Sequence, residues 1–212
     1  MPIGTSPAVS SSKASLVREN LKYLALAAAL FIVGMAFGIV GGSSVGTEGS
    51  GSIFDGGLDS IFEELESISQ FYVPYQPFTV VFLFFKNLLT TGMTFILGPL
   101  IIMPAAVLLL NGYILGMVGT IVANEVSLVA ALASLAPHGV FEMPALVIAA
   151  AAALRFGVAT LKKIRSMIGR SEFSISNDFE GSVKLFVLST ILLFVAAIME
   201  TYVTPMLMGI SP

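Results

Sequence analysis

The sequence contains no cysteine and only one histidine. Without cysteine the protein has no disulfide bond, no thiolate zinc ligand and no cysteine nucleophile. A zinc site of the HExxH type needs two histidines, so the sequence excludes it. The single histidine, His138, has Ser127 and Ser134 as its nearest serines, and neither stands in a nucleophile-type turn. We therefore expect no metal, no cofactor and no enzymatic activity.

Charged residues are also scarce, at 11% of the chain, whereas hydrophobic residues make up 56%. Soluble domains carry roughly 25% charged residues. Apolar segments of about 20 residues are long enough to cross a bilayer. The composition therefore predicts an integral membrane protein, and the net charge of −3 gives no indication of nucleic-acid binding.

The positions of the apolar runs predict an all-α bundle of about five transmembrane helices. Leu58, Ile61 and Leu65 recur at helical spacing opposite acidic residues, which predicts one additional amphipathic helix. The expected order is a cytoplasmic tail (1–20), helix 1 (21–40), an extracytoplasmic acidic loop (41–76) with the amphipathic helix (58–72), core helices 2–4 (78–161), a basic cytoplasmic loop (162–182), helix 5 (183–202) and an extracytoplasmic tail (203–212).

The distribution of charges predicts the orientation. Residues 1–20 and 155–170 are basic, whereas residues 41–76 contain six acidic residues and no basic one. Because loops rich in lysine and arginine stay in the cytoplasm, we expect a cytoplasmic N-terminus and an extracytoplasmic C-terminus in the cell membrane.

One polar motif, Ala-Pro-His-Gly-Val-Phe-Glu-Met-Pro-Ala at residues 136–145, interrupts the fourth apolar run. Pro137 and Pro144 each lack a backbone donor and disfavour helix in the preceding residue. We therefore predict a broken helix at 137–143, with Gly139 inside the gap and Glu142 just before the second half. Helix N-termini favour an anion at that position.

Residue counts at about 1.5 Å per helical residue place several polar side chains near the bilayer centre. Glu142 lies about 20 Å above Arg155, which we place at the cytoplasmic interface. The predicted intramembrane cluster consists of Lys86, Asn87, Asn111, His138 and Glu142. Such groups serve either as hydrogen-bonding contacts between helices or as a transport, proton or ligand site. The sequence leaves both uses open.

The segments FLFFKNLL, LLLNGYILG and LAPHGVFEMPALVIAAAAALRFG resemble the stage II sporulation protein M family over residues 78–157. The resemblance rests on Asn87, Asn111-Gly112, Pro137, His138, Gly139, Phe141, Glu142, Pro144, Ala145 and Arg155. It implies a multi-pass protein of a membrane complex, and the namesake is similar in being a scaffold for cell-wall-degrading enzymes. Lys86 departs from the family pattern, where an asparagine is usual, so an ion pair with Glu142 would replace a neutral hydrogen bond.

Two functions follow as hypotheses. The first is a non-enzymatic membrane scaffold that forms a homodimer in the lipid bilayer, with an extracytoplasmic protein partner at residues 58–72 as a further expectation. The alternative is a small-solute or ion transporter or channel whose site surrounds Glu142 and His138, because broken helices at the midplane are typical of such sites.

Overall fold

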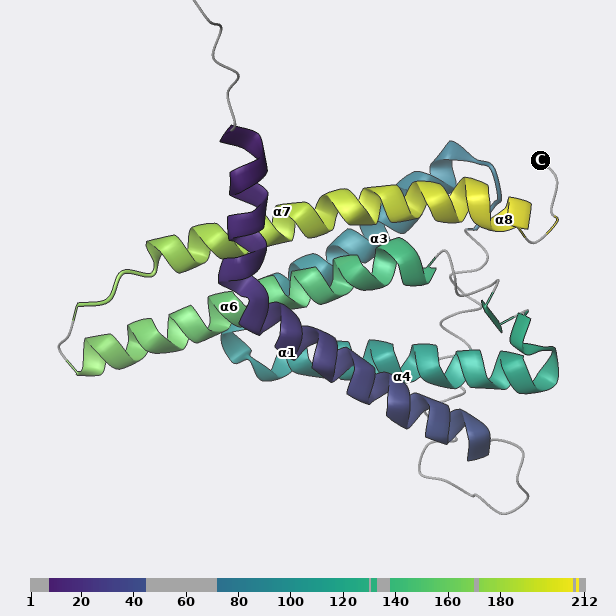
Figure 1. The fold of residues 1–212 in the computed structure, drawn as a ribbon, viewed down its shortest axis with the longest axis horizontal. Coiled ribbons are helices and arrows are strands. Elements are labelled where there is room, and N and C mark those ends of the chain that lie inside the picture. The colour runs from purple at the N-terminus through teal and green to yellow at the C-terminus, as the bar shows by residue number, and fades with distance from the viewer. Residues whose placement is uncertain are drawn as a thin grey trace, which may run out of the picture.

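The computed structural model of the protein is an all-α bundle, and it describes residues 8–44, 72–129, 131–132, 138–169, 172–207 and 209 (Figure 1). Its long helices are α1 (Ala8–Ser44), α3 (Pro77–Ile96), α4 (Ile102–Glu125), α6 (Met143–Ile168) and α7 (Ser176–Ile198). Shorter turns are η1 (Gly98–Leu100), η2 (His138–Glu142), η3 (Met199–Val203) and α8 (Thr204–Leu207). Among these described residues, five segments are long and apolar enough to cross a membrane. The predicted membrane bundle is confirmed.

Some helix ends lie where the sequence predicts them, and others do not. Proline at the first helical position begins α3, as Pro77 suits a site that needs no backbone donor. The first helix starts at Ala8, well before the predicted residue 21, and its apolar span covers Arg18–Ser43. The amphipathic helix predicted at 58–72 lies outside the described residues, except for Tyr72, which is not helical.

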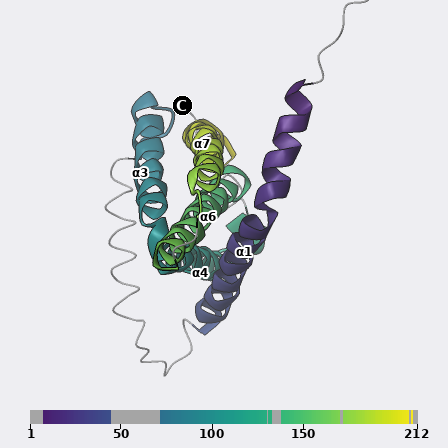
Figure 2. The same ribbon diagram turned by 90° about the vertical axis from the view of Figure 1, so that its left-hand side faces the viewer.

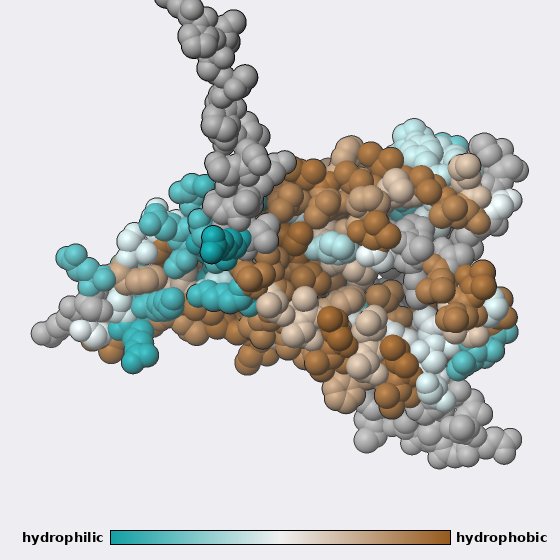
Figure 3. All heavy atoms as spheres, viewed as in Figure 1, coloured by the Kyte–Doolittle hydropathy of each residue, from teal (hydrophilic) through white to brown (hydrophobic). Residues whose placement is uncertain are grey.

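Ring contacts and hydrogen bonds fix the directions of the helices. The rings of Phe84 and Phe194 lie 5.5 Å apart and those of Phe95 and Phe186 lie 4.8 Å apart, so α3 and α7 are antiparallel. The hydroxyl of Ser189 donates to the backbone oxygen of Ala145 at 2.7 Å and thereby joins α7 to the start of α6. Hydrophilic residues gather at the end of the bundle where α6 ends and α7 begins (Figure 3), here called the polar end.

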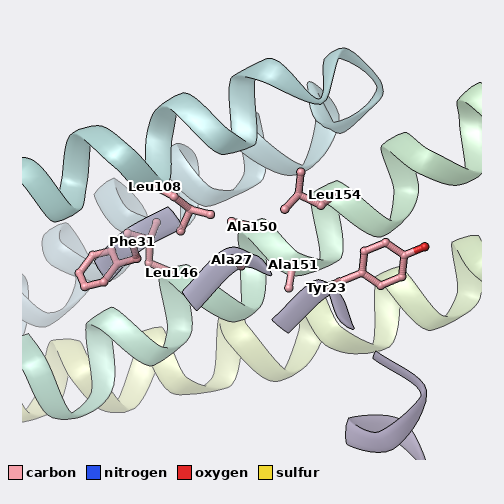
Figure 4. Packing of buried hydrophobic residues seen from close by; sticks show 8 residues of the cluster. All are labelled: Tyr23, Ala27, Phe31, Leu108, Leu146, Ala150, Ala151 and Leu154. Carbon is pink, nitrogen blue, oxygen red and sulfur yellow. The ribbon is translucent and has the colours of Figure 1, made fainter. Parts of the chain in front are cut away.

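Helix α6 is the centre of the bundle. In the most apolar 18-residue stretch of its span, Gly139–Ile168, 61% of the residues are buried, against 22–33% in the corresponding stretches of the other four spans. Its middle consists of alanines, Ala149–Ala153, which are fully buried, and side chains this small let neighbouring helices approach closely. The core around it is made of Tyr23, Ala27, Phe31, Leu108, Leu146, Ala150, Ala151 and Leu154 (Figure 4).

Helices α1 and α4 pack backbone to backbone (Figure 2). Added Cβ atoms at Gly112 and Gly116 would meet the backbone oxygens of Phe31 and Met35, so these two glycines, four residues apart, mark a close helix contact. The sequence analysis missed the matching glycines on α1, Gly34, Gly38 and Gly42. In a bilayer, packing of this kind replaces the hydrophobic driving force between helices.

The α1–α4 contact is tested by Gly38→Ala. A Cβ at Gly38 would lie 2.8 Å from the carbonyl carbon of Tyr113 and 2.9 Å from the backbone nitrogen of Met117, and backbone atoms cannot move aside. We expect a loss of roughly 1–3 kcal/mol of stability, measured by thermal unfolding in detergent. The control is Gly92→Ala on α3, where nothing lies within 4 Å of the added atom. Equal melting of both variants would show that the contact is unimportant.

Candidate functional site

A small polar cavity lies at the middle of the bundle. Its volume is about 30 Å³, and a water molecule needs roughly 10–15 Å³ on the same measure, so two or three waters fit. Five elements contribute to its wall: Asn87, Thr90 and Thr91 from α3, Asn111 from α4, Glu142 from η2, Leu146 from α6 and Leu193 from α7. The cavity therefore joins polar side chains that are far apart in the sequence.

The α3 wall follows from helical spacing, because residues three and four apart share a face. The hydroxyl of Thr91 donates to the backbone oxygen of Asn87 at 2.8 Å, and the hydroxyl of Thr90 donates to that of Lys86 at 3.2 Å. Both hydroxyls thus use their hydrogen inside the helix and keep lone pairs as acceptors. Within the described part of the chain the Asn87 amide makes no hydrogen bond.

The α4 wall consists of Asn111, whose side-chain nitrogen donates to the backbone oxygen of Val107 at 2.8 Å. This bond turns the amide along its own helix and leaves the side-chain oxygen as an acceptor. Gly112 beside it packs against α1, so Asn111 is held at the cavity by the close contact of the neighbouring residue.

Glu142 ends the π-helical turn η2 and is the N-cap residue of α6. Pro144 cannot donate to the residue four before it, and its ring would collide with that carbonyl in a regular helix. A wider turn relieves this conflict, and such π-bulges are frequent at functional sites. The gap in the helix predicted at 137–143 is therefore absent over the described residues 138–143, where a wide turn continues directly into α6, while Pro137 lies outside the described residues. The side chain of Glu142 is half-buried and engaged within the chain.

The structure brings together three members of the predicted cluster, Asn87, Asn111 and Glu142. It does not bring Lys86 to the cavity, because Lys86 is exposed on the outside of α3 and forms no ion pair with Glu142. Consecutive residues of a helix point about 100° apart, and at this place in α3 it is Asn87 that lines the cavity. Only the backbone of His138 is described, as the first residue of η2. The sequence analysis missed Thr90 and Thr91.

The position of Lys86 carries an energetic cost. An isolated charge in the hydrocarbon core costs roughly 2.5–3.5 kcal/mol on insertion scales. Lys86 is the tenth of the 20 residues of α3 and is surrounded on the exposed surface by apolar side chains such as Phe85 and Leu89. Nothing in the described part of the chain offsets that cost.

Arg155 forms a second polar cluster near the polar end. Its guanidinium donates to the side-chain oxygen of Asn20 at 2.6 Å, to the carboxylate of Asp178 at 3.2 and 3.3 Å, and to the backbone oxygen of Asn177 at 3.3 Å. Arg155 was predicted to reach out to the interface, but it is buried, with 8% exposure. It links α1, α6 and α7, and Gly181 provides the space, because an added Cβ would overlap the guanidinium.

The opposite end is closed by the segment before α3. The hydroxyl of Tyr72 donates to the backbone oxygen of Glu200 at 2.9 Å, and the backbone nitrogen of Tyr75 donates to that of Thr201 at 3.1 Å. Burial raises the pKa of the Tyr72 phenol, and the nearby Glu200 and Tyr75 raise it further. The second π-helical turn, η3, is thus tied to the chain entering α3.

These features describe a multi-pass membrane protein with a polar cavity inside its helices. A family model described as stage II sporulation protein M matches residues 27–205, so the chain belongs to this family, and the resemblance noted at 78–157 is confirmed. An uncharacterized protein of Methanocaldococcus jannaschii is 28% identical over 128 residues. The match spans 59% of this chain and 65% of that relative, just under two thirds of its length. No solved structure matches the chain.

The Arg155 cluster is tested by Arg155→Met. This change keeps an unbranched apolar stem but removes the guanidinium that donates to Asn20 and Asp178, and removal of one partner from a buried pair is strongly destabilising. We expect a loss of roughly 2–4 kcal/mol, measured by thermal unfolding in detergent. Arg165→Met is the control, since Arg165 is exposed on the same helix. If the two variants melt alike, the cluster does not hold the helices together.

Proposed function

We propose that this protein is a non-enzymatic scaffold of the cell membrane. The size of the cavity is the observation that carries the proposal. Pockets for small molecules measure roughly 300–1,000 Å³, whereas this cavity is about 30 Å³. It has room for water between polar groups and no room for a solute of ordinary size. Its polar residues are thus suited to hold helices together.

The polar bonds inside the bundle support the same role. Ser189 of α7 bonds the backbone of α6, and Arg155 of α6 bonds side chains of α1 and α7. Within the described residues no group of three or more acidic or histidine side chains could hold a metal ion. These contacts stabilise a rigid bundle whose outer surface is available to other membrane components.

The orientation and partners belong to this proposal. We place the basic polar end in the cytoplasm, because positive residues are retained there. The acidic segment 41–76 would then lie outside the cell, where residues 58–72, largely outside the described part, would bind an extracytoplasmic protein. The protein would act without a cofactor.

The scaffold proposal is tested by two replacements of one residue. Glu142→Gln keeps a hydrogen-bonding group in the cavity, so we expect melting close to that of the parent. Glu142→Leu removes it and should cost about 1 kcal/mol, as interhelical polar contacts do in membranes. Thermal unfolding in detergent measures both, with Glu125→Leu at the exposed end of α4 as control. A Glu142→Leu variant as stable as the parent would contradict the structural role.

A second candidate function, transport of protons or small ions, is favoured by one observation. Polar side chains of α3 and α4 and a carboxylate from a π-helical turn meet at one level and enclose space for water. Irregular helices near the midplane form the ion sites of many transporters.

Transport is tested in proteoliposomes that contain a pH-sensitive dye. If the cavity conducts protons, the parent should dissipate a pH gradient, and Glu142→Gln should abolish this flux without loss of fold. Flux that is absent in the parent, or unchanged by Glu142→Gln, would eliminate this function and leave the scaffold.

A further inference from the structure

Lys86 is a basic residue without a partner among the described residues. It lies about 13 Å from the first residue of α3 and about 15 Å from the last, in the middle of a membrane-spanning helix. Neither end is within reach of a lysine side chain that extends toward the polar surface. Ionisable residues at such depth face protein or pair with an opposite charge.

The described part of the chain does not supply that pair. Lys86 is exposed, and its side chain makes no hydrogen bond or ion pair within the described residues. The exposed surface around it is formed by Val81, Phe85, Leu89 and Met93, which are apolar. Since no described residue of the same chain pairs with Lys86, a carboxylate of a second copy can take that place.

The depth of Lys86 matches that of Glu142. Phe84 on α3 meets Phe194 on α7 at 5.5 Å, so Lys86 lies close to the level of Leu193. Leu193 and Glu142 line the same cavity. The other acidic residues of the described spans lie near helix ends: Glu19, Glu125, Asp178, Glu180 and Glu200. Among the described residues, Glu142 is thus the carboxylate at the level of Lys86.

The cavity also reaches the surface beside Lys86. Thr90 lines the cavity and is itself exposed, and it lies one helical turn from Lys86, to whose backbone oxygen it donates. Lys86 and Thr90 therefore share a face of α3 that borders the cavity. In this structure the side chain of Lys86 is exposed, and Asn87 lines the cavity in its place.

We propose that two copies of this chain associate through the Lys86–Thr90 face of α3, and that Lys86 of each copy donates to Glu142 in the cavity of the other copy. A two-fold axis along the membrane normal keeps equivalent residues at equal depth and forms both pairs at once. A carboxylate accepts several hydrogen bonds, so the engagement of Glu142 within its own chain is compatible with a second donor. The shared site does not depend on whether the protein is a scaffold or a transporter.

Charge reversal in two separately tagged copies tests the pairing. Lys86→Glu places two carboxylates together in its homodimer, and Glu142→Lys places two ammonium groups together, so each should self-associate at least about tenfold more weakly than the parent. Co-expressed, the two variants form two opposite-charge pairs, and their mixed dimer should return to within about threefold of the parent. Energy transfer between labelled copies in phosphatidylcholine vesicles measures the self-association of the parent and of each variant, and the association of the mixed dimer. Failure of the mixed dimer to recover would overturn the proposal, as would a parent that is monomeric in these vesicles.

A second experiment covers the case in which Glu142→Lys does not fold. The chain has no cysteine, so single cysteines can be introduced without background. Leu89→Cys lies on the proposed face and should cross-link two copies under mild oxidation, whereas Phe37→Cys on the exposed face of α1 should not. Addition of Lys86→Met to Leu89→Cys should reduce cross-linking by roughly threefold to twentyfold, with unchanged melting of the monomer. Cross-linking that is absent, or unaffected by Lys86→Met, would refute the shared site.

Discussion

Every polar group placed in hydrocarbon must find a partner within the protein, and this constraint shapes the bundle. The membrane span Gly139–Ile168 carries two polar features that need such partners, the π-helical turn that ends at Glu142 and the guanidinium of Arg155. Both have partners because the other helices surround this span, whose most apolar stretch of 18 residues is 61% buried. The central position of α6 is thus a consequence of its polar residues as much as of its alanines.

Small residues make this arrangement possible. Gly98 and Gly157 bring the α3–α4 connection against the backbone of α6, and Gly181 gives Arg155 its space. Larger side chains would move these helices apart and separate the polar groups from their partners. Hydrogen bonding between the helices therefore depends on close packing, because the glycines set the distances between helices at which the hydrogen bonds form.

The sequence could predict how deep a polar residue lies in the membrane, but not the direction in which its side chain points from the helix. Apolar run lengths gave the five spans, and residue counts placed Asn87, Asn111 and Glu142 at one level, where the structure joins them. Lys86 has the same depth but does not line the cavity, since the rotation of α3 depends on packing that no residue count includes. The bonds of Arg155 to Asn20 and Asp178 were likewise beyond prediction, because residues far apart in the sequence meet only through the fold.

In the proposed dimer, the lysine on the surface of α3 would also affect the balance between one copy and two. A charge at this level makes a single copy less stable in lipid by roughly 2.5–3.5 kcal/mol, and a partner carboxylate removes that penalty when two copies meet. The asparagine that the family resemblance places at this position carries no such penalty, so it would drive association less strongly. Substitution by lysine would thus convert a helix-packing position into one that favours assembly, and it would do so without any change to the cavity inside each copy.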